Sequence, residues 1–200
     1  MKSPKKILIA NRGVIAIRAL RAAKELGYQV ASVYSTIDKD QKHLKLSDEA
    51  ICIGPAAAKD SYLNEAAIIS AAELASADAI YPGYGFLAEN SSFAEKCNQS
   101  GFKFVGPDPK VIGIMGDKIK AKELVESLGV PIVPGYTGRI ESKEQVEKIT
   151  DHIGYPVIVK ASAGGGGKGM RIVNKRQELE SNLKAAQSEA LNSFGDDRVF

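Results

Sequence analysis

The 200-residue sequence contains no tryptophan and only two cysteines, Cys52 and Cys97. The cysteines form no CxxC pair, so buried free thiols in a reducing cytoplasm are the default interpretation. Long hydrophobic runs are also absent, since no stretch approaches the roughly 18 apolar residues that a transmembrane helix requires. The apolar run after the basic residues 1–6 covers only residues 7–10, which is too short for a signal peptide. We therefore expect a cytoplasmic protein, or one of the mitochondrial matrix only if an upstream transit peptide has been removed.

A strong charge of either sign is missing too. The chain has 27 lysines and arginines against 24 aspartates and glutamates, a formal net charge of +3 and a pI near 8.7. This excess is too small to indicate nucleic-acid binding, and no basic run is interleaved with aromatic residues. We expect neither nucleic acid nor a membrane as a partner. The composition, 44% hydrophobic and 26% charged, is typical of a soluble globular chain with one large or two small domains.

Glycine, by contrast, is concentrated between two short β-branched runs. Residues 157–159 and 170–173 have the composition of strands, and five glycines lie within residues 164–169 between them. Glycine lets backbone N–H groups approach a ligand closely, and consecutive N–H groups can form a concave anion site. Lys160 and Lys168 add cations at both ends of this loop. The pattern predicts a hairpin whose glycine-rich flap binds a polyphosphate.

Three other interpretations of this stretch are an ordinary surface hairpin, a P-loop and a Rossmann fingerprint. An ordinary surface hairpin with two solvated lysines needs only two to five loop residues and one or two glycines. A P-loop fails on spacing, because Ser162 stands where the first glycine belongs and Gly169 where Ser or Thr belongs. A strand rather than a helix follows the loop, and this context also excludes a Rossmann fingerprint.

The first half of the chain alternates between strands and helices. A helix after the first strand is expected to end near Leu26, and Asn64 and Asn90 are expected to begin two further helices. Five such strands predict a doubly wound parallel sheet. Only one glycine follows the first strand, so a pyrophosphate-binding fingerprint is absent. The expected strands are residues 6–10, 29–34, 49–53, 79–81 and 102–105.

Two loops of this half have different expected roles. Residues 82–87 (Pro-Gly-Tyr-Gly-Phe-Leu) follow the fourth strand, at the edge where open α/β sheets place their ligands. They form either a substrate contact or a tight turn with two aromatic side chains in the core, and the sequence leaves both open. Residues 36–48 are polar, and we expect His43 among them to be a solvated loop residue.

The second half begins with a helix that Asp117 can cap, with Ala121, Leu124, Val125 and Leu128 on its apolar face. Lys118 at its N-terminus opposes the helix macrodipole, which makes sense if an anion lies there; the alternative is a lysine that snorkels to solvent. Ser142 and Gln145 fit a capping box for the next helix. After the flap hairpin and a last helix, residues 197–200 look like the start of a strand that stays unpaired.

Four motifs together resemble biotin carboxylase, the ATP-grasp component of acetyl-CoA, propionyl-CoA, methylcrotonyl-CoA and pyruvate carboxylases. They are Ile9-Ala10-Asn11-Arg12-Gly13, Tyr81-Pro82-Gly83-Tyr84-Gly85-Phe86-Leu87-Ala88-Glu89-Asn90, Met115-Gly116-Asp117-Lys118 and Lys160-Ala161-Ser162-Ala163-Gly164 with its continuation to Met170. The resemblance covers all 200 residues but only about the first half of a family member. It implies an α/β pre-ATP-grasp domain of Rossmann-like, doubly wound type over residues 1–114. Residues 115–200 would hold the linker helices and the small α+β lid domain of an ATP-grasp fold, incomplete at its C-terminal end.

The resemblance also implies the roles of individual residues. ATP phosphates would contact Lys118 and Lys160, with the flap residues Gly164, Gly165, Gly166 and Gly167 folded over them and Met170 near the adenine. Tyr84 and Gly85 match positions near biotin, and Arg21 and Glu25 match the dimer contact of bacterial members. The catalytic base and the metal ligands are expected beyond residue 200. The sequence departs from the family at Val14, where glutamate is usual, and more mildly at Tyr81 and Ala88.

The implied reaction is the carboxylation of biotin on a carrier protein. ATP with Mg²⁺ (or Mn²⁺) phosphorylates bicarbonate to carboxyphosphate, and the carboxyl group passes to biotin. A biotin carboxyl carrier protein or domain, a carboxyltransferase and a second copy of the chain are the implied partners. Two alternatives remain open: another ATP-grasp ligase, of the carbamoyl-phosphate synthetase or purine-pathway carboxylase kind, and a non-enzymatic nucleotide-binding or dimerisation module.

Overall fold

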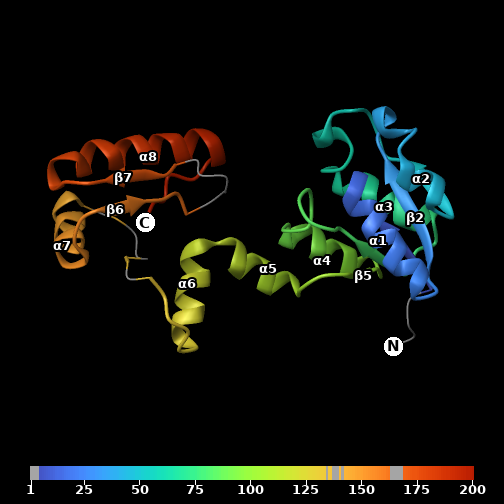
Figure 1. The fold of residues 1–200 in the computed structure, drawn as a ribbon, viewed down its shortest axis with the longest axis horizontal. Coiled ribbons are helices and arrows are strands. Elements are labelled where there is room, and N and C mark those ends of the chain that lie inside the picture. The colour runs from blue at the N-terminus through green and yellow to red at the C-terminus, as the bar shows by residue number, and fades with distance from the viewer. Residues whose placement is uncertain (1–4, 134, 137–139, 141, 163–168) are drawn as a thin grey trace. The chain divides into compact units, whose positions relative to one another are not determined.

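The computed structural model describes residues 5–133, 135–136, 140, 142–162 and 169–200 (Figure 1). The chain forms two compact units, residues 1–113 and residues 114–200. Among the described residues, no helix combines the length and the apolar character needed to cross a membrane.

The first unit is built on a five-stranded sheet in which all strands are parallel, with the order β3-β2-β1-β4-β5. Ile7 of β1 lies beside Val30 of β2 on one side and Ala79 of β4 on the other. The strand order therefore reverses between β1 and β4, and the predicted doubly wound sheet is confirmed. Its strands are β1 (Lys6–Ile9), β2 (Gln29–Tyr34), β3 (Glu49–Cys52), β4 (Ala79–Tyr81) and β5 (Lys103–Phe104).

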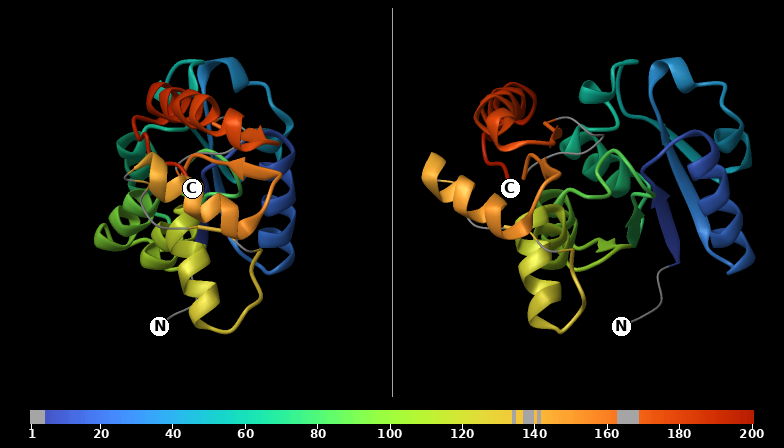
Figure 2. Two further views of the ribbon diagram at one scale, coloured as in Figure 1. Left: turned by 90° about the vertical axis from the view of Figure 1, so that its left-hand side faces the viewer. Right: turned by 60° about the vertical axis from the view of Figure 1, so that its left-hand side comes forward.

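Helices cover both faces of this sheet, because successive strand residues point to opposite sides. Ile9 and Val30 pack against Leu20 of α1, which lies beside β1 and β2 in Figure 2. Leu8 and Val33 face the other way, into the core with α3 and α4. The helices of this unit are α1 (Gly13–Glu25), α2 (Lys42–Leu46), α3 (Glu65–Leu74) and α4 (Ser91–Gln99), with 3₁₀ turns at η1 (Thr36–Asp38) and η2 (Ala58–Asp60). Helix α5 (Pro109–Gly116) begins in this unit and ends in the second one.

Two asparagines begin helices where the sequence predicted them. Asn64 Oδ1 accepts a hydrogen bond from the Ala67 N–H at 3.1 Å, and Asn90 Oδ1 accepts one from the Phe93 N–H at 2.9 Å. Each bond satisfies an N–H group that a helix start leaves without a partner. Asn90 also donates through Nδ2 to Glu65 Oε1, so the start of α4 is tied to the start of α3.

The prediction that His43 is a solvated loop residue was wrong. His43 lies in the short helix α2 and is completely buried. Its Nε2 lies 3.4 Å from the Val33 carbonyl of β2. A single histidine in a polar stretch has no periodic pattern around it, so no local pattern predicts that this helix covers the sheet.

The second unit contains a small antiparallel hairpin and helices packed on one side of it. Val157 of β6 pairs with Val173 of β7, and α8 runs along the hairpin in Figures 1 and 2. A core of Val146, Val159 and Leu179 joins the hairpin to α7 and α8. The elements are α6 (Lys118–Ser127), α7 (Lys143–Ile153), β6 (Val157–Val159), β7 (Arg171–Val173), η3 (Arg176–Glu178) and α8 (Leu179–Phe194).

The chain end pairs with the hairpin. The expectation that it would stay unpaired was wrong. Lys160 and Phe200 exchange both backbone hydrogen bonds at 2.9 Å, and the Ser162 N–H donates to the Arg198 carbonyl at 2.8 Å. These bonds form an antiparallel contact with Ala161 opposite Val199. Residues 198–200 therefore extend the sheet of the second unit along β6.

Both predicted caps of the second unit are present, but one helix face differs from the prediction. Asp117 Oδ1 accepts from the N–H groups of Ile119 and Lys120, and Ser142 Oγ accepts from the Gln145 N–H. Helix α6 buries none of its residues, and its expected apolar side chain Leu128 is largely exposed. Helix formation and burial are separate events here, because the cap acts locally whereas burial needs a second surface.

Candidate functional site

The outward face of the β6–β7 hairpin is apolar and exposed. Ile158 lies directly opposite Ile172 across the two strands, and both side chains point away from the core that holds Val159 and Val173. Ile172 is 61% exposed although it is an isoleucine in a strand. Exposed Met170 precedes β7. An exposed apolar pair on a sheet is suited to binding a flat apolar group such as a base.

Lys160 stands at the edge of this apolar face. It follows β6 by one residue, and the period of two along a strand places it on the same side as Ile158. Its backbone is held by the two hydrogen bonds with Phe200, so the position of its Cα is fixed by the sheet. Lys160 is also one of the residues around a cavity of about 470 Å³. The cavity is lined further by residues of α6, α7, α8, the chain before α7 and the chain end, among them Lys122, Tyr136, Ile149, Leu183 and Phe200.

Lys118 is the first residue of α6, directly after the capping residue Asp117. The cap is linked to the chain end that pairs with β6, since Asp117 Oδ2 lies 3.6 Å from Arg198 Nη1. The Arg198 carbonyl in turn accepts from the Ser162 N–H, two residues after Lys160. The start of α6 and the end of β6 are thus connected through one arginine, which the sequence did not single out.

The predicted phosphate-binding glycines Gly164, Gly165, Gly166 and Gly167, with Lys168, lie outside the described residues. The loop ends at Gly169, whose φ is +68° and where a Cβ atom would approach the Ala161 Cβ to 2.8 Å. The Ala161 N–H donates to the Gly169 carbonyl at 3.1 Å. Only glycine fits this close approach, which brings the two ends of the loop together.

A second pocket, of about 480 Å³, opens at the carboxyl ends of β1 and β4, where the strand order reverses. This is the place where doubly wound sheets bind ligands. Asn11 is buried there, and its Nδ2 donates to the carbonyls of Pro82 at 2.8 Å and Tyr84 at 3.0 Å. The pocket is lined by Asn11, Arg12, Val14, Ile15, Tyr84, Gly85 and Phe86.

The two aromatic residues of the 82–87 loop behave differently. Tyr84 is 71% exposed beside the pocket. Phe86 is partly buried and stacks on Tyr62, with ring centroids 4.9 Å apart and planes at 14°. One ring of the loop is therefore packed, as the tight-turn alternative expected, and the other is exposed beside the pocket, where a substrate contact stays a prediction.

A buried polar cluster beside this pocket was missed by sequence reasoning. Asp38 Oδ2 accepts from Ser35 Oγ at 2.7 Å, Tyr62 Oη at 2.8 Å and Arg12 Nη1 at 3.2 Å. Burial raises the pKa of Asp38, but the hydrogen bonds from Ser35, Tyr62 and Arg12 outweigh it and hold the pKa below its usual value. Burial, with the neighbouring Asp38 carboxylate, raises the pKa of Tyr62 to about 12. No local sequence pattern links these residues, because they are brought together only in the folded structure.

Arg21 and Glu25, the predicted dimer-contact residues, are both exposed and four residues apart on α1. They lie on the side of the helix away from the buried Ala16, Leu20 and Ala23.

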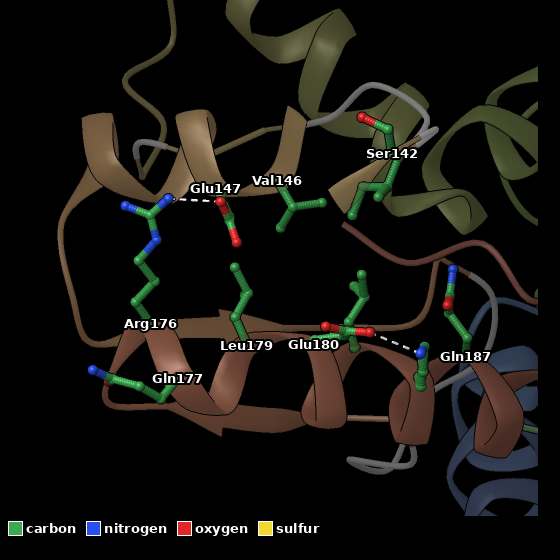
Figure 3. A pocket seen from close by; sticks show the side chains of 11 residues that line it. Ser142, Val146, Glu147, Arg176, Gln177, Leu179, Glu180 and Gln187 are labelled. Carbon is green, nitrogen blue, oxygen red and sulfur yellow. Dashed lines mark hydrogen bonds and ion pairs between the residues drawn. The ribbon is translucent and has the colours of Figure 1, made fainter. Parts of the chain in front are cut away.

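A further hollow, of about 460 Å³, lies between α7 and α8 (Figure 3). Its charged side chains are paired with one another: Arg176 Nη2 lies 2.6 Å from Glu147 Oε2, and Lys184 Nζ lies 2.8 Å from Glu180 Oε1. Within the described part of the chain, no group of three or more His, Cys, Asp and Glu side chains could hold a metal ion.

Two family models match the chain, one for each unit. The model for "Biotin carboxylase, N-terminal domain" matches residues 3–112, and the model for "Carbamoyl-phosphate synthase L chain, ATP binding domain" matches residues 117–200. Biotin carboxylase 1 of Bacillus subtilis is 53% identical over 196 residues, which cover 98% of this chain and 44% of that protein. The chloroplastic biotin carboxylase of Arabidopsis thaliana is 48% identical over 195 residues, covering 98% of this chain and 36% of that protein.

Solved structures show the same similarity. A biotin carboxylase–β,γ-ATP complex from Campylobacter jejuni has a TM-score of 0.94 at 51% identity, with 98% of this chain and 44% of that chain covered. The biotin carboxylase domain dimer of Hydrogenobacter thermophilus 2-oxoglutarate carboxylase, in complex with MgADP, ADP and bicarbonate, has a TM-score of 0.91 at 47% identity. That match covers all of this chain and 44% of the other. The chain spans less than half the length of these relatives, and the match over residues 3–112, more than half of its own length, shows that it belongs to the biotin carboxylase family.

Proposed function

We propose that this chain supplies the N-terminal part of a biotin carboxylase, which carboxylates carrier-bound biotin with bicarbonate and ATP through carboxyphosphate. In this proposal residues 1–114 form the pre-ATP-grasp domain, and residues 115–200 form the linker helices and part of the ATP-grasp lid. The observation that carries it is the outward face of the β6–β7 hairpin, where an exposed Ile158–Ile172 pair ends at Lys160. The family match supports the same assignment.

The hairpin face accounts for nucleotide binding in physical terms. Adenine lies against Ile158, Ile172 and Met170, which lose exposed apolar surface when it binds. The phosphates extend toward Lys160 and Lys118, with the loop of Gly164 to Gly167 over them. Ammonium–phosphate hydrogen bonds are charge-assisted and therefore stronger than neutral ones. Phosphoryl transfer depends mainly on positioning and neutralisation of charge, and the lysines supply part of both.

Mg²⁺ (or Mn²⁺) bound with ATP would neutralise further charge on the phosphates. Its protein ligands and the catalytic base are proposed to lie in the part of a biotin carboxylase that follows residue 200. We use "completed enzyme" for residues 1–200 followed by that remaining part.

The pocket at the β1–β4 switch point is proposed to receive biotin, with Tyr84 and Gly85 beside it. The carrier protein or domain would present biotin there, and a carboxyltransferase would use the product. Arg21 and Glu25 are proposed to contact a second copy of the chain. The biotin carboxylase match in the first unit favours this function over another ATP-grasp ligase.

Titration of Lys160→Gln in the completed enzyme tests the proposal. Loss of a charge-assisted phosphate contact, typically worth about 1.5–3 kcal/mol, should lower ATP affinity roughly tenfold or more. Lys184→Gln is the matched control, because Lys184 is an exposed lysine of the same unit whose partner is Glu180. Lys118→Gln should behave like Lys160→Gln, and NADH should bind more weakly than ATP. Equal ATP affinity in the Lys160 and Lys184 variants, or tighter binding of NADH, would contradict the proposal.

A further inference from the structure

The 82–87 loop has an unusual backbone. Gly83, Gly85 and Phe86 all have positive φ values, of 71°, 73° and 41°. For phenylalanine this left-handed conformation is strained, and such strain persists only where surrounding contacts determine the conformation. A Cβ atom at Gly83 would come within 2.6 Å of Ile15 Cγ2, so the loop also lies too close to α1 for any other residue there. Contacts around Phe86 must therefore hold the loop in place.

Two sets of contacts hold it, from opposite sides. Asn11 at the end of β1 binds the carbonyls of Pro82 and Tyr84 through Nδ2, while its Oδ1 accepts from the Arg12 N–H at 2.8 Å. On the other side the Phe86 ring stacks on Tyr62. The Arg12 guanidinium lies 5.2 Å from the centroid of the Tyr62 ring and 5.5 Å from that of Phe86, within the range of a cation–π interaction.

Asp38 fixes both partners of Phe86. A single oxygen, Oδ2, accepts from Tyr62 Oη and from Arg12 Nη1, so the aromatic ring and the cation share one buried anchor. Tyr62 Oη also accepts from the Ser35 N–H at 3.1 Å, which ties the ring to the end of β2. Tyr62 itself is fully buried. Tyr62 thus has little freedom to move, whereas Arg12 is partly exposed and is held by its ion pair with Asp38.

We propose that Arg12, Asp38 and Tyr62 are positioning residues that act through Phe86 to hold Tyr84 and Gly85 in the geometry that binds biotin. The inference rests on the proposed function, and it adds Asp38 and Tyr62, which are not among the residues lining the pocket, and a role for Arg12 beyond lining it. Loss of the anchor releases the strain at Phe86, and the loop then occupies other conformations in which Tyr84 and Gly85 no longer face the pocket. The residues proposed to bind ATP belong to the second unit, whereas Arg12, Asp38 and Tyr62 belong to the first, so we expect ATP affinity not to depend on the cluster.

Asp38→Asn is the first test variant, because asparagine keeps the shape of the side chain and removes its charge. Asp78→Asn is the matched control. Asp78 Oδ2 accepts from the N–H groups of Lys5 and Lys6, at the opposite, amino-terminal edge of the same sheet. Both variants remove one carboxylate that holds the first unit together, but only one of them is connected to the loop.

Kinetics of the completed enzyme separate the two roles. In Asp38→Asn the KM for free biotin should rise roughly ten- to a hundredfold, as expected when a binding group is misplaced. The KM for ATP in bicarbonate-dependent ATP cleavage without biotin should stay within about twofold of the parent value, which is the change expected for a site the variant does not touch. Asp78→Asn should leave both constants unchanged. Equal rises in the biotin KM for the two variants, or no rise for Asp38→Asn, would overturn the inference.

Hydrogen exchange of the 200-residue chain gives a second, activity-independent readout. Amides of residues 83–87 should exchange faster in Asp38→Asn and in Phe86→Leu than in Asp78→Asn. Unchanged exchange in both would refute the positioning role even if the kinetics changed. If the parent enzyme shows no biotin-dependent turnover, the proposed function fails, whereas the exchange measurement still decides whether the cluster holds the loop.

Discussion

Two buried titratable side chains near β2 respond differently to burial, because only one is surrounded by hydrogen-bond donors. Asp38 accepts three hydrogen bonds on one oxygen and stays ionised. For His43, no described residue lies within hydrogen-bonding distance of Nδ1. Burial lowers the pKa of His43, although the Val33 carbonyl and the Asp38 charge oppose this. The folded state therefore holds His43 neutral.

This difference predicts how stability depends on pH. Because the pKa of His43 is lower in the folded state than its ordinary 6.5, its contribution to stability is complete above pH 6.5. The contribution is lost as the pH falls from 6.5 through the folded-state pKa. Urea unfolding between pH 7.5 and 5 should show a steeper loss for the parent chain than for His43→Gln, which does not titrate. Parallel curves for the two chains would show that His43 does not contribute.

Val14 is a position where a negatively charged side chain should stabilise the fold. It is the second residue of α1 and 80% exposed, and the first turn of that helix carries no acidic side chain. Glutamate, the residue usual in the family, would face the positive end of the helix dipole there. Val14→Glu should therefore exceed Val14→Gln in unfolding free energy by about 0.3–1 kcal/mol at low salt. Urea titration at two salt concentrations measures this, and a difference that is absent or insensitive to salt would argue against the dipole interaction.

At the scale of an element, the β6–β7 hairpin divides its residues between two tasks. Val159 and Val173 face the hydrophobic core of the second unit, whereas Ile158 and Ile172 face outward. An isoleucine that remains exposed contributes little to folding. The alternation along the strands therefore separates the residues that stabilise the fold from those proposed to bind ATP.

A substitution on the outward face should weaken ATP binding, whereas one on the inward face should lower the stability of the fold. Ile172→Thr keeps a β-branched side chain and should change the unfolding free energy by less than about 0.5 kcal/mol. It should weaken ATP binding to the completed enzyme about fivefold, because roughly 1 kcal/mol of apolar contact with the adenine is lost. Val173→Ala empties a buried position and should cost about 2 kcal/mol of stability. Calorimetric titration and thermal unfolding of both variants measure this; a large stability loss in Ile172→Thr would show that its side chain serves the fold.

At the scale of the whole molecule, the chain carries part of a proposed ATP site and part of a proposed biotin site, in two separate units. The metal ligands and the catalytic base are assigned to the part of a biotin carboxylase that follows residue 200. The 200-residue chain alone should therefore bind ATP weakly and carboxylate no biotin. Bicarbonate-dependent ATP cleavage with free biotin, measured on this chain beside the completed enzyme, is the test. Turnover well above the blank would show that residues 1–200 suffice.

Much of the fold was predictable because it depends on neighbours in the sequence. The caps at Asn64, Asn90, Asp117 and Ser142 each bond to a backbone N–H two or three residues ahead. The two strands of the hairpin follow from short β-branched runs with glycine between them, and the strands of the sheet follow from short apolar segments that alternate with helices. The family motifs assigned Lys160 to the ATP phosphates and Tyr84 to the biotin site, and those assignments remain predictions to be tested.

Only the tertiary structure decided which distant residues meet. Asp38 lies 26 positions from Arg12 and 24 from Tyr62, yet one of its oxygens accepts from both. His43 is buried because α2 covers β2, and Leu128 is exposed because no described surface of its unit covers it. A local pattern specifies backbone conformation within one or two turns, since propensities and caps act over that range. The contacts of a buried polar side chain are set instead by how strands and loops pack, and that packing is a property of the folded chain.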